Sequence, residues 1–403
     1  MSETTGNVLD PIALLDGARP EELDNYLRQQ YPAGIQPMGA DALRFTLLTG
    51  ATAGTDMNLS LQRVEGNRNF TNKIWNAARF VLSQLTAETE SGSVGVWGNG
   101  SGSHTPTPPH FHTGLSERWI LSRLSATISD ATRLMDGFQY GEAGRQMYDF
   151  FWSEFCDWYL EISKIALYRG DDAAKAATRA TLVTVLDASL RLLHPFIPFV
   201  TEETWGYLKA AEEQGSGGAE GQRGGGAGWP EALIVAPWPQ PGARDLAAEA
   251  DMGLLMELVR GIRNTRSEYN VEPGKRIPAT IAAGDRLALL QDQAETLCTL
   301  ARLDGSQLTL AATLPAPAHA RTLVAGSVTA YLPLAGLMDL AAERGRLGKE
   351  LAEIETQIGR SQGLLAGSFA QRAPANVVQR ERDKLAELTI RAEKLRTRLA
   401  DLG

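Results

Sequence analysis

The sequence is poor in the residue types on which most self-contained active sites depend. Its 403 residues include only two cysteines, Cys156 and Cys298, and five histidines. Two cysteines so far apart exclude a disulfide framework and a cysteine-rich zinc site, and they suit a reducing cytoplasm. No glycine-rich phosphate loop follows a predicted strand, and no Gly-x-Ser-x-Gly nucleophile elbow is present. The sequence therefore offers no complete active site of its own.

Long apolar runs are also missing. The longest, such as LRLLHPFIPFV (190–200), are interrupted by Arg, His and Pro and are shorter than the ~20 residues of a membrane span. The net charge of −9 argues against a protein held to nucleic acid by an overall basic surface. The charge is uneven, because 341–403 carries 12 Lys and Arg against 9 Asp and Glu, whereas 1–340 carries 27 against 39. The tail is therefore positive on a negative chain.

Two glycine-rich stretches interrupt the chain, at about 88–113 and 212–230. Gly and Ser contribute little to a core, so both stretches are expected to be flexible loops between helices. The first holds His104, His110 and His112. These histidines lack carboxylate or cysteine partners and fixed spacing, so we expect no metal site.

Most of the remaining chain has the apolar periodicity of helices. Apolar residues recur three and four apart over 115–138, 141–170 and 175–208. Within the last of these, Pro195 is expected to end or kink the helix, because Pro removes a backbone donor and restricts the residue before it. A wide apolar stripe in the second segment is typical of a bundle core. Its members are Met147, Phe150, Phe151, Phe155, Trp158, Tyr159 and Ile162.

After a further helix at 252–270, short segments rich in Thr, Val, Ile and Leu appear. RIPATIAAG, SQLTLAAT and SVTAYLPL are bounded by Gly, Pro or Asp, and one helical stretch (286–303) separates the first two. This pattern predicts a small α+β module at 276–335. The expected fold is therefore mainly α, with a connecting segment at 1–40, a helical bundle at 41–275, the module, and a terminal arm at 336–403.

The arm contains two heptad series separated by GSFAQRAPAN, whose Gly367 and Pro374 break a helix. The first series is Leu337, Leu340, Leu347, Leu351, Ile354 and Ile358. The second is Val378, Leu385, Leu388, Ala392, Leu395, Leu399 and Leu402. The pattern favours an antiparallel coiled-coil hairpin, and the alternative is an intermolecular dimer coil.

One helical segment, VEGNRNFTNKIWNAARFVL (64–82), has an unusual polar face. Its apolar stripe consists of Phe70, Ile74, Ala77 and Val81. Another face carries Asn69, Lys73 and Asn76, flanked by Asn72 and Arg79. Asn is a mediocre helix former, and amides and ammonium groups on one face suit contact with phosphates and base edges of a folded RNA. The alternative is that these amides satisfy loop backbone elsewhere in the bundle.

Basic residues cluster in two further places. The first group precedes the turn VEPGK and comprises Arg260, Arg263, Asn264, Arg266 and Lys275. The second lies on the arm and comprises Arg372, Arg380, Arg382, Lys384, Arg391, Lys394, Arg396 and Arg398. Either group is compatible with RNA contact or with an ordinary solvated helix surface.

Several strings together identify a family resemblance. EGNRNFTNKIWNAARFVL, GLSERWILSRL, FCDWYLEISK, HPFIPFVTEETW, GIRNTRSEYNVEPGKRI and FAQRAPANVVQRERDKLAEL resemble, in this order, the C-terminal half of bacterial-type valyl-tRNA synthetase. The resemblance covers essentially the whole chain apart from the glycine-rich loops. It implies a class I synthetase anticodon-binding bundle and a hairpin that reaches toward the outer corner of tRNA.

The first residues resemble the later part of the family's KMSKS loop. Met1, Ser2, Glu3 and Thr4 stand at its end, and Glu3 replaces the second Lys. In the family this loop stabilises charge on ATP through positioned cations, so a carboxylate there would repel the phosphates. The segment is therefore expected to be a degenerate remnant without a catalytic role, at the cut edge of a larger enzyme.

The resemblance implies tRNA as the partner. The tRNA contacts are expected at Asn69, Lys73, Asn76, Arg79, Arg263, Arg266, Arg372, Arg380, Lys384 and Arg398. ATP belongs to the full-length family, whereas no cofactor is expected in this chain, which lacks the HIGH motif and the editing domain. We expect a cytoplasmic monomer without membrane contact that aids valine-tRNA ligation only with a separate N-terminal half. The alternative is a stand-alone, non-catalytic tRNA-binding protein.

Overall fold

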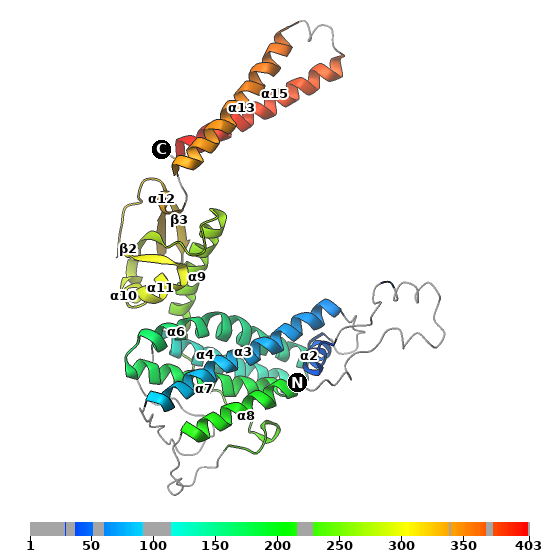
Figure 1. Cartoon of the computed structure of the whole chain (residues 1–403), viewed down its shortest axis with the longest axis vertical. Coiled ribbons are helices and arrows are strands. Elements are labelled where there is room, and N and C mark those ends of the chain that lie inside the picture. The colour runs from blue at the N-terminus through cyan, green and yellow to red at the C-terminus, as the bar shows by residue number, and fades with distance from the viewer. Residues whose placement is uncertain are drawn as a thin grey trace. The chain divides into compact units, whose positions relative to one another are not determined.

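The computed structural model describes residues 29, 37–50, 60–91, 114–215, 229–337, 340–367 and 374–401 (Figure 1). Two compact units divide the chain, Met1–Met252 and Gly253–Gly403. The division falls within one helix, α9 (Leu246–Glu268). The four-part division expected from the sequence stays a prediction.

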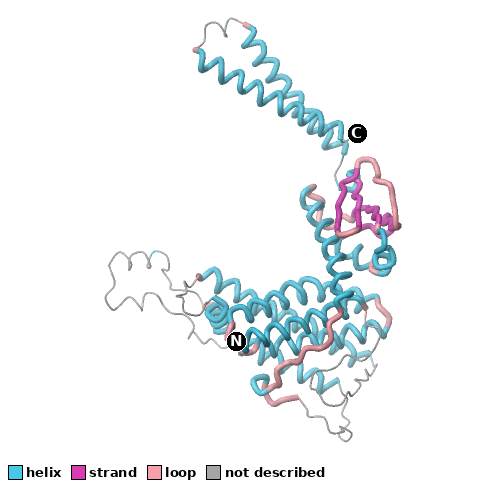
Figure 2. The backbone as a smooth tube through the Cα atoms, turned by 180° about the vertical axis from the view of Figure 1, so that it is seen from behind, coloured by secondary structure: helices cyan, strands magenta, loops and turns pink. Residues whose placement is uncertain are grey.

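The first unit is a bundle of helices (Figure 2). Its α-helices are α2 (Ala40–Gly50), α3 (Leu61–Ser91), α4 (Leu115–Asp136), α5 (Tyr140–Asp149), α6 (Leu160–Arg169), α7 (Asp172–Leu193) and α8 (Pro198–Gly215). A π-helix, η3 (Phe150–Tyr159), joins α5 to α6, and a 3₁₀ turn, η4 (Leu233–Val235), precedes α9. As predicted, α7 ends just before His194-Pro195.

The predicted core stripes are confirmed. Phe70, Ile74, Ala77 and Val81 of α3 are buried, as is every member of the large stripe in 141–170. The structure differs from the prediction in the shape of that second helix. A 3.6-residue period predicts a continuous α-helix, whereas ten residues form a π-helix in which the Leu160 N–H bonds the Phe155 carbonyl. Phe155 packs between Phe151 and Tyr159, with ring centroids 5.4 and 6.2 Å apart.

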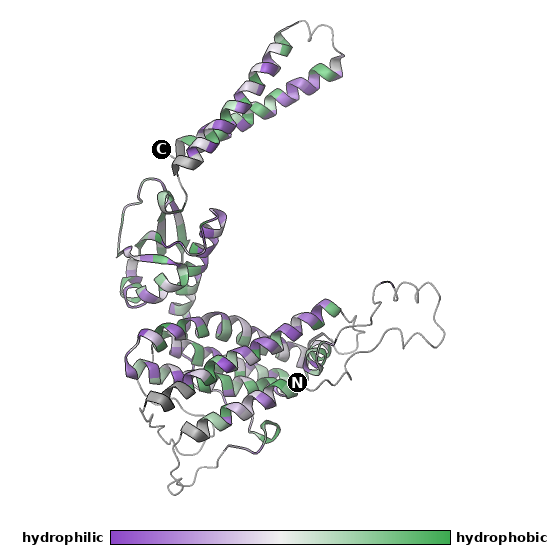
Figure 3. Cartoon of the chain, viewed as in Figure 1, coloured by the Kyte–Doolittle hydropathy of each residue, from purple (hydrophilic) through white to green (hydrophobic). Residues whose placement is uncertain are grey.

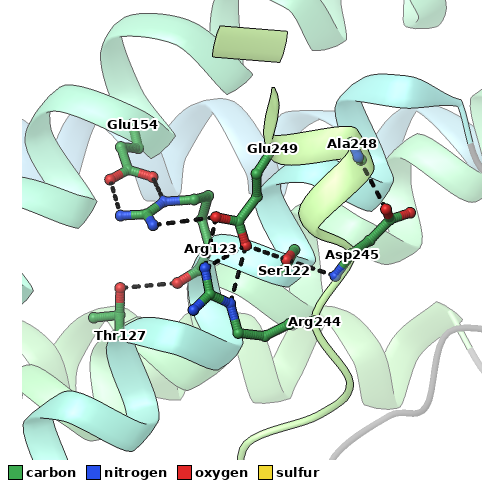
Figure 4. A network of polar contacts seen from close by, with 8 residues as sticks. All are labelled: Ser122, Arg123, Thr127, Glu154, Arg244, Asp245, Ala248 and Glu249. Carbon is green, nitrogen blue, oxygen red and sulfur yellow. Dashed lines mark hydrogen bonds and ion pairs between the residues drawn. The ribbon is translucent and has the colours of Figure 1, made fainter. Parts of the chain in front are cut away.

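A polar network fastens the first turn of α9 to α4 and η3 (Figure 4). Arg123 donates two parallel hydrogen bonds to Glu154, at 2.7 and 2.9 Å, and a longer one to Glu249 at 3.5 Å. Arg244 donates to both oxygens of Glu249, at 2.8 and 2.7 Å. Ser122 also donates to Glu249. The hydrogen bonds from Arg123 to Glu154 raise the pKa of Arg123 above its usual range, although Arg123 is partly buried.

The second unit contains a four-stranded sheet. Its strands are β1 (Ile277–Ala282), β2 (Leu303–Ala311), β3 (Ala320–Ala325) and β4 (Val328–Pro333). Their order is β2-β1-β4-β3, with β1 and β2 parallel and the other pairs antiparallel. The parallel crossover runs through η5 (Gly284–Arg286), α10 (Leu287–Asp292) and α11 (Ala294–Ala301). The predicted small α+β module is present. Burial alternates along β1 and β4, as expected for strands with one face on a core.

Two details of the module differ from the prediction. The single helix expected over 286–303 is broken at Gln293, which caps α10 and precedes α11. The strand β3 was not predicted. Its residues Arg321, Thr322 and Val324 are exposed, because β3 is an edge strand with little of the alternation that marks a half-buried strand.

After α12 (Leu334–Leu337), helices α13 (Leu340–Ala366) and α15 (Ala375–Asp401) run antiparallel as a hairpin (Figure 1). Its seam buries Leu347, Ile354, Ala392 and Leu395, with Leu351, Ile358, Leu388 and Leu399 packed beside them. Hydrophilic and hydrophobic residues alternate along both helices (Figure 3). The predicted intrachain hairpin is confirmed, and so is its apolar seam over the described side chains, whereas Leu340 and Leu402 of the predicted series lie outside them. In the described part of the chain no helix is long and apolar enough to cross a membrane.

Candidate nucleic-acid interface

An exposed amide and arginine file runs along α3. Asn69, Asn72, Asn76 and Arg79 are all exposed, and their spacing of three, four and three places them on one side of the helix. Within the described residues none of these four side chains makes a hydrogen bond or an ion pair. We call these four residues the α3 file. Among the described residues, therefore, no other group occupies its donors and acceptors.

The amide that serves the interior is a different one, Asn67. It is buried, and its Nδ2 donates a 2.7 Å hydrogen bond to Thr46 Oγ1 on α2. The alternative for the α3 file was that its amides hydrogen-bond to loop backbone. Among the described residues, none of them makes such a bond.

Lys73 lies beside the α3 file. The sequence predicts that its ammonium contacts tRNA, but in the structure the ammonium is already paired. Its Nζ is 2.5 Å from Asp157 Oδ1 and 4.2 Å from the centroid of the Trp152 ring. The Lys73 side chain is 28% exposed, so the pair is partly shielded from water. The ammonium is thus held in one place between a carboxylate and an aromatic face. It can reach a ligand only beside, or in exchange with, Asp157.

The π-helix supplies residues that the sequence prediction missed. Trp152 and Asp157 both come from η3, and Trp152 stacks on Tyr148, with centroids 5.6 Å apart. Tyr148 in turn packs on Phe70 of α3 at 4.5 Å. One signal was present, because Trp152 falls outside the buried stripe of its segment. Trp152 and Asp157 of η3, together with Tyr148 of α5, thus lie against α3.

The arginines near the end of α9 mainly bind backbone. Arg266 is 7% exposed and donates to the carbonyls of Arg302 (3.4 Å) and Glu272 (3.1 Å). Burial, followed by the nearby Arg302 charge, lowers the pKa of Arg266. Arg263 is exposed but donates through Nε to the Leu300 carbonyl at 2.9 Å. Arg266 therefore holds the turn after α9, and the surface position expected for it is not observed.

On the hairpin, Arg380 and Lys384 are exposed on α15. Lys384 is 3.8 Å from Glu381, a weak surface pair. Arg391 and Arg396 instead pair across the hairpin with Glu350 and Glu355, each at 2.7 Å. The remaining predicted positions lie outside the described side chains: Met1, Ser2, Glu3, Thr4, Arg372 and Arg398.

Both cysteines are free thiols. Burial raises the pKa of Cys156 to about 12, so it is no nucleophile. Among the described residues, no group of three or more His, Cys, Asp and Glu side chains is placed to hold a metal ion. The glycine-rich loop with its three histidines lies outside those residues.

Comparison with known proteins agrees with this geometry. Residues 117–281 match the family described as the anticodon-binding domain of tRNA ligase. Residues 339–403 match the valyl-tRNA synthetase tRNA-binding arm. The matched ranges cover most of the bundle from α4 onward and the hairpin. By these matches the chain is similar, as a class, to the tRNA-ligase regions that comprise an anticodon-binding domain and a tRNA-binding arm.

Whole-chain relatives narrow this class. A valine-tRNA ligase of Xylella fastidiosa (strain M23) is 37% identical over all of this chain and 41% of its own length. A valine-tRNA ligase of Bacillus cereus (strain ATCC 14579) is 37% identical over 99% of the chain and 43% of its own. The chain corresponds to the C-terminal region of the valine-tRNA ligase family, which confirms the resemblance, and it spans about two fifths of these relatives.

A solved structure was also matched, the ternary complex of Agrobacterium radiobacter K84 LeuRS with tRNA and LeuAMS. It is 18% identical over 62% of this chain and 22% of that chain, with a TM-score of 0.33. That score is too low to establish a common fold.

Proposed function

We propose that this chain binds a valine-accepting tRNA and contributes to its aminoacylation, with ATP and valine, only together with a catalytic N-terminal half. The observation that carries the proposal is the α3 file, exposed and without partners in the described structure. It lies in a bundle whose later part (117–281) matches the anticodon-binding domain of tRNA ligase, in a chain whose hairpin matches a tRNA-binding arm. Amides read base edges, and arginine binds phosphates.

The proposed contacts differ in weight. The α3 file, Lys73, Arg380 and Lys384 are the surface positions that support the proposal. Arg263 is retained as a weaker candidate because one of its nitrogens is already bonded, and Arg372 and Arg398 are retained from the sequence alone. Arg266 is proposed to act only by holding the turn after α9.

The test measures how strongly two variants, Arg79→Ala and Arg321→Ala, bind a transcript of a valine tRNA at different salt concentrations. Arg321 is an exposed arginine on β3, a strand that carries none of the proposed contacts, and it serves as the charge-matched control. Removing one phosphate contact lowers the slope of log affinity against log salt by about 1. We expect this change for Arg79→Ala alone. Equal slopes for the two variants would contradict a phosphate contact on α3.

A second function has one observation in its favour. Glu3 stands where the family loop has a lysine, which suits a free-standing tRNA-binding protein without ATP chemistry. Valine-dependent ATP-pyrophosphate exchange, measured after adding the N-terminal half of a relative, separates the two functions. Exchange that requires both parts supports the first, and tRNA binding with no exchange supports the second. In either case we propose a monomer in the cytoplasm.

A further inference from the structure

An exposed pair of aromatic rings stands at the turn between α4 and α5. Phe138 is 78% exposed and Tyr140 is 40% exposed. Their ring centroids are 6.1 Å apart and the planes meet at 79°, an edge-to-face pair. Neither residue belongs to the core stripes or to the α3 file.

The backbone holds Phe138 in a conformation that aromatic residues rarely adopt. Its φ is +55°, in the left-handed region. The Phe138 N–H bonds the Met135 carbonyl at 3.0 Å, and the Gln139 N–H bonds the Leu134 carbonyl at 2.8 Å. These two bonds form the helix-ending motif in which glycine is the usual residue at this position. At the end of α9 the same motif places Asn270 there, a residue that tolerates it.

Apart from its edge contact with Tyr140, a bulky ring that is both strained and 78% exposed contributes little to the core, so its place points to a ligand. Phe138 and Tyr140 form a platform only two rings wide. Exposed charged residues flank it along the chain, on the end of α4 and the start of α5: Asp130, Arg133, Asp136, Glu142 and Arg145. A protein interface needs roughly 800 Å² on each partner, whereas a planar base needs one ring face. Unpaired RNA bases commonly stack on such rings.

We propose that Phe138, supported edge-on by Tyr140, stacks on an unpaired nucleobase of the bound tRNA. The inference rests on the proposed function, because the turn lies within the segment that matches the anticodon-binding domain of tRNA ligase. The flanking stretches of α4 and α5 carry three carboxylates and two arginines, and each arginine is paired with a carboxylate, which favours contact with a base over contact with a phosphate.

Phe138→Gly tests this directly, because glycine removes the ring and relieves the backbone strain at once. The experiment titrates the full chain with a valine tRNA transcript at two salt concentrations and records thermal unfolding. We expect about tenfold weaker binding at both salts, an unchanged salt slope and an equal or higher unfolding midpoint. Phe138→Trp, which keeps an aromatic face, should bind like the wild type.

Transcripts with a single abasic site at each unpaired position of the tRNA in turn identify the base. At the stacked base, removing the base and introducing Phe138→Gly should together weaken binding no more than either change alone. Additive effects at every position would overturn the proposal, as would wild-type affinity in Phe138→Gly. If that variant instead loses binding to the N-terminal half of a relative, the rings are a protein contact and the proposal is wrong. Absence of salt-sensitive tRNA binding by the wild-type chain would mean failure of the proposed function itself.

Discussion

The network around Arg123 makes a quantitative prediction about the bundle. Arg123→Ala removes two parallel hydrogen bonds to Glu154 and one to Glu249. These carboxylate side chains are 21% and 15% exposed, so water replaces the lost bonds incompletely. A hydrogen bond to a charged group contributes about 1.5–3 kcal/mol. Because Arg123 itself is 33% exposed, hydration offsets much of the summed contribution of the three bonds, and we expect a net loss of about 2 kcal/mol in all.

For a unit of this size, each kcal/mol corresponds to about 2–4 °C, so the unfolding midpoint should fall by about 4–8 °C. Calorimetry measures it. Arg133→Ala is the matched control on the same helix, since Arg133 is 65% exposed and its ion pair with Asp130 is long, at 3.5 Å. Its midpoint should change by less than 2 °C. Equal shifts for the two variants would refute the reasoning that burial and bidentate geometry make the Arg123 network stabilising.

Two further changes test the packing and electrostatics of the bundle. Gly144→Ala places a Cβ 2.6 Å from Thr49 Cγ2 and 3.0 Å from Phe196 Cε1, so we expect a loss of about 1–3 kcal/mol in chemical denaturation. In contrast, Gly206→Ala, with open space around its Cβ, should gain up to about 1 kcal/mol, and the same sign for both would contradict this. Burial raises the pKa of Glu249, but bonds from Arg244 and Ser122 outweigh it and leave the pKa below 4.5. Glu249 therefore stabilises the fold above its unfolded pKa and loses this effect as pH falls through its lower folded pKa, so Glu249→Gln should flatten the fall in stability as pH drops below about 4.5. If stability falls just as steeply at acidic pH in Glu249→Gln as in the wild type, this role of Glu249 is contradicted.

The α3 helix shows what periodicity can predict. The 3.6-residue period separates Phe70 and Ile74 from Asn69 and Asn76, and the structure buries the first pair and exposes the second. The hairpin seam was predictable for the same reason. Where one face is buried and the other is solvated, side-chain chemistry alone determines the pattern.

The residues that the sequence did not reveal depend on contacts distant along the chain. Arg266 looks like a surface cation, but its partners are carbonyls, and carbonyls carry no sequence signal. The pairing of Lys73 with Asp157 depends on a π-helical turn, which a search for α-helical periodicity does not detect. β3 lacks alternation because an edge strand buries little. Charge and periodicity thus predict which face of a helix is buried, whereas tertiary packing determines which groups become hydrogen-bond and ion-pair partners.

The most direct test of tRNA recognition compares binding of the full chain to a valine tRNA transcript and to the same transcript with its anticodon replaced, each at two salt concentrations. We predict binding that weakens as salt rises and weakens further when the anticodon is changed. Equal affinity for both transcripts, or no binding to either, would contradict the proposal that this bundle recognises tRNA through its anticodon.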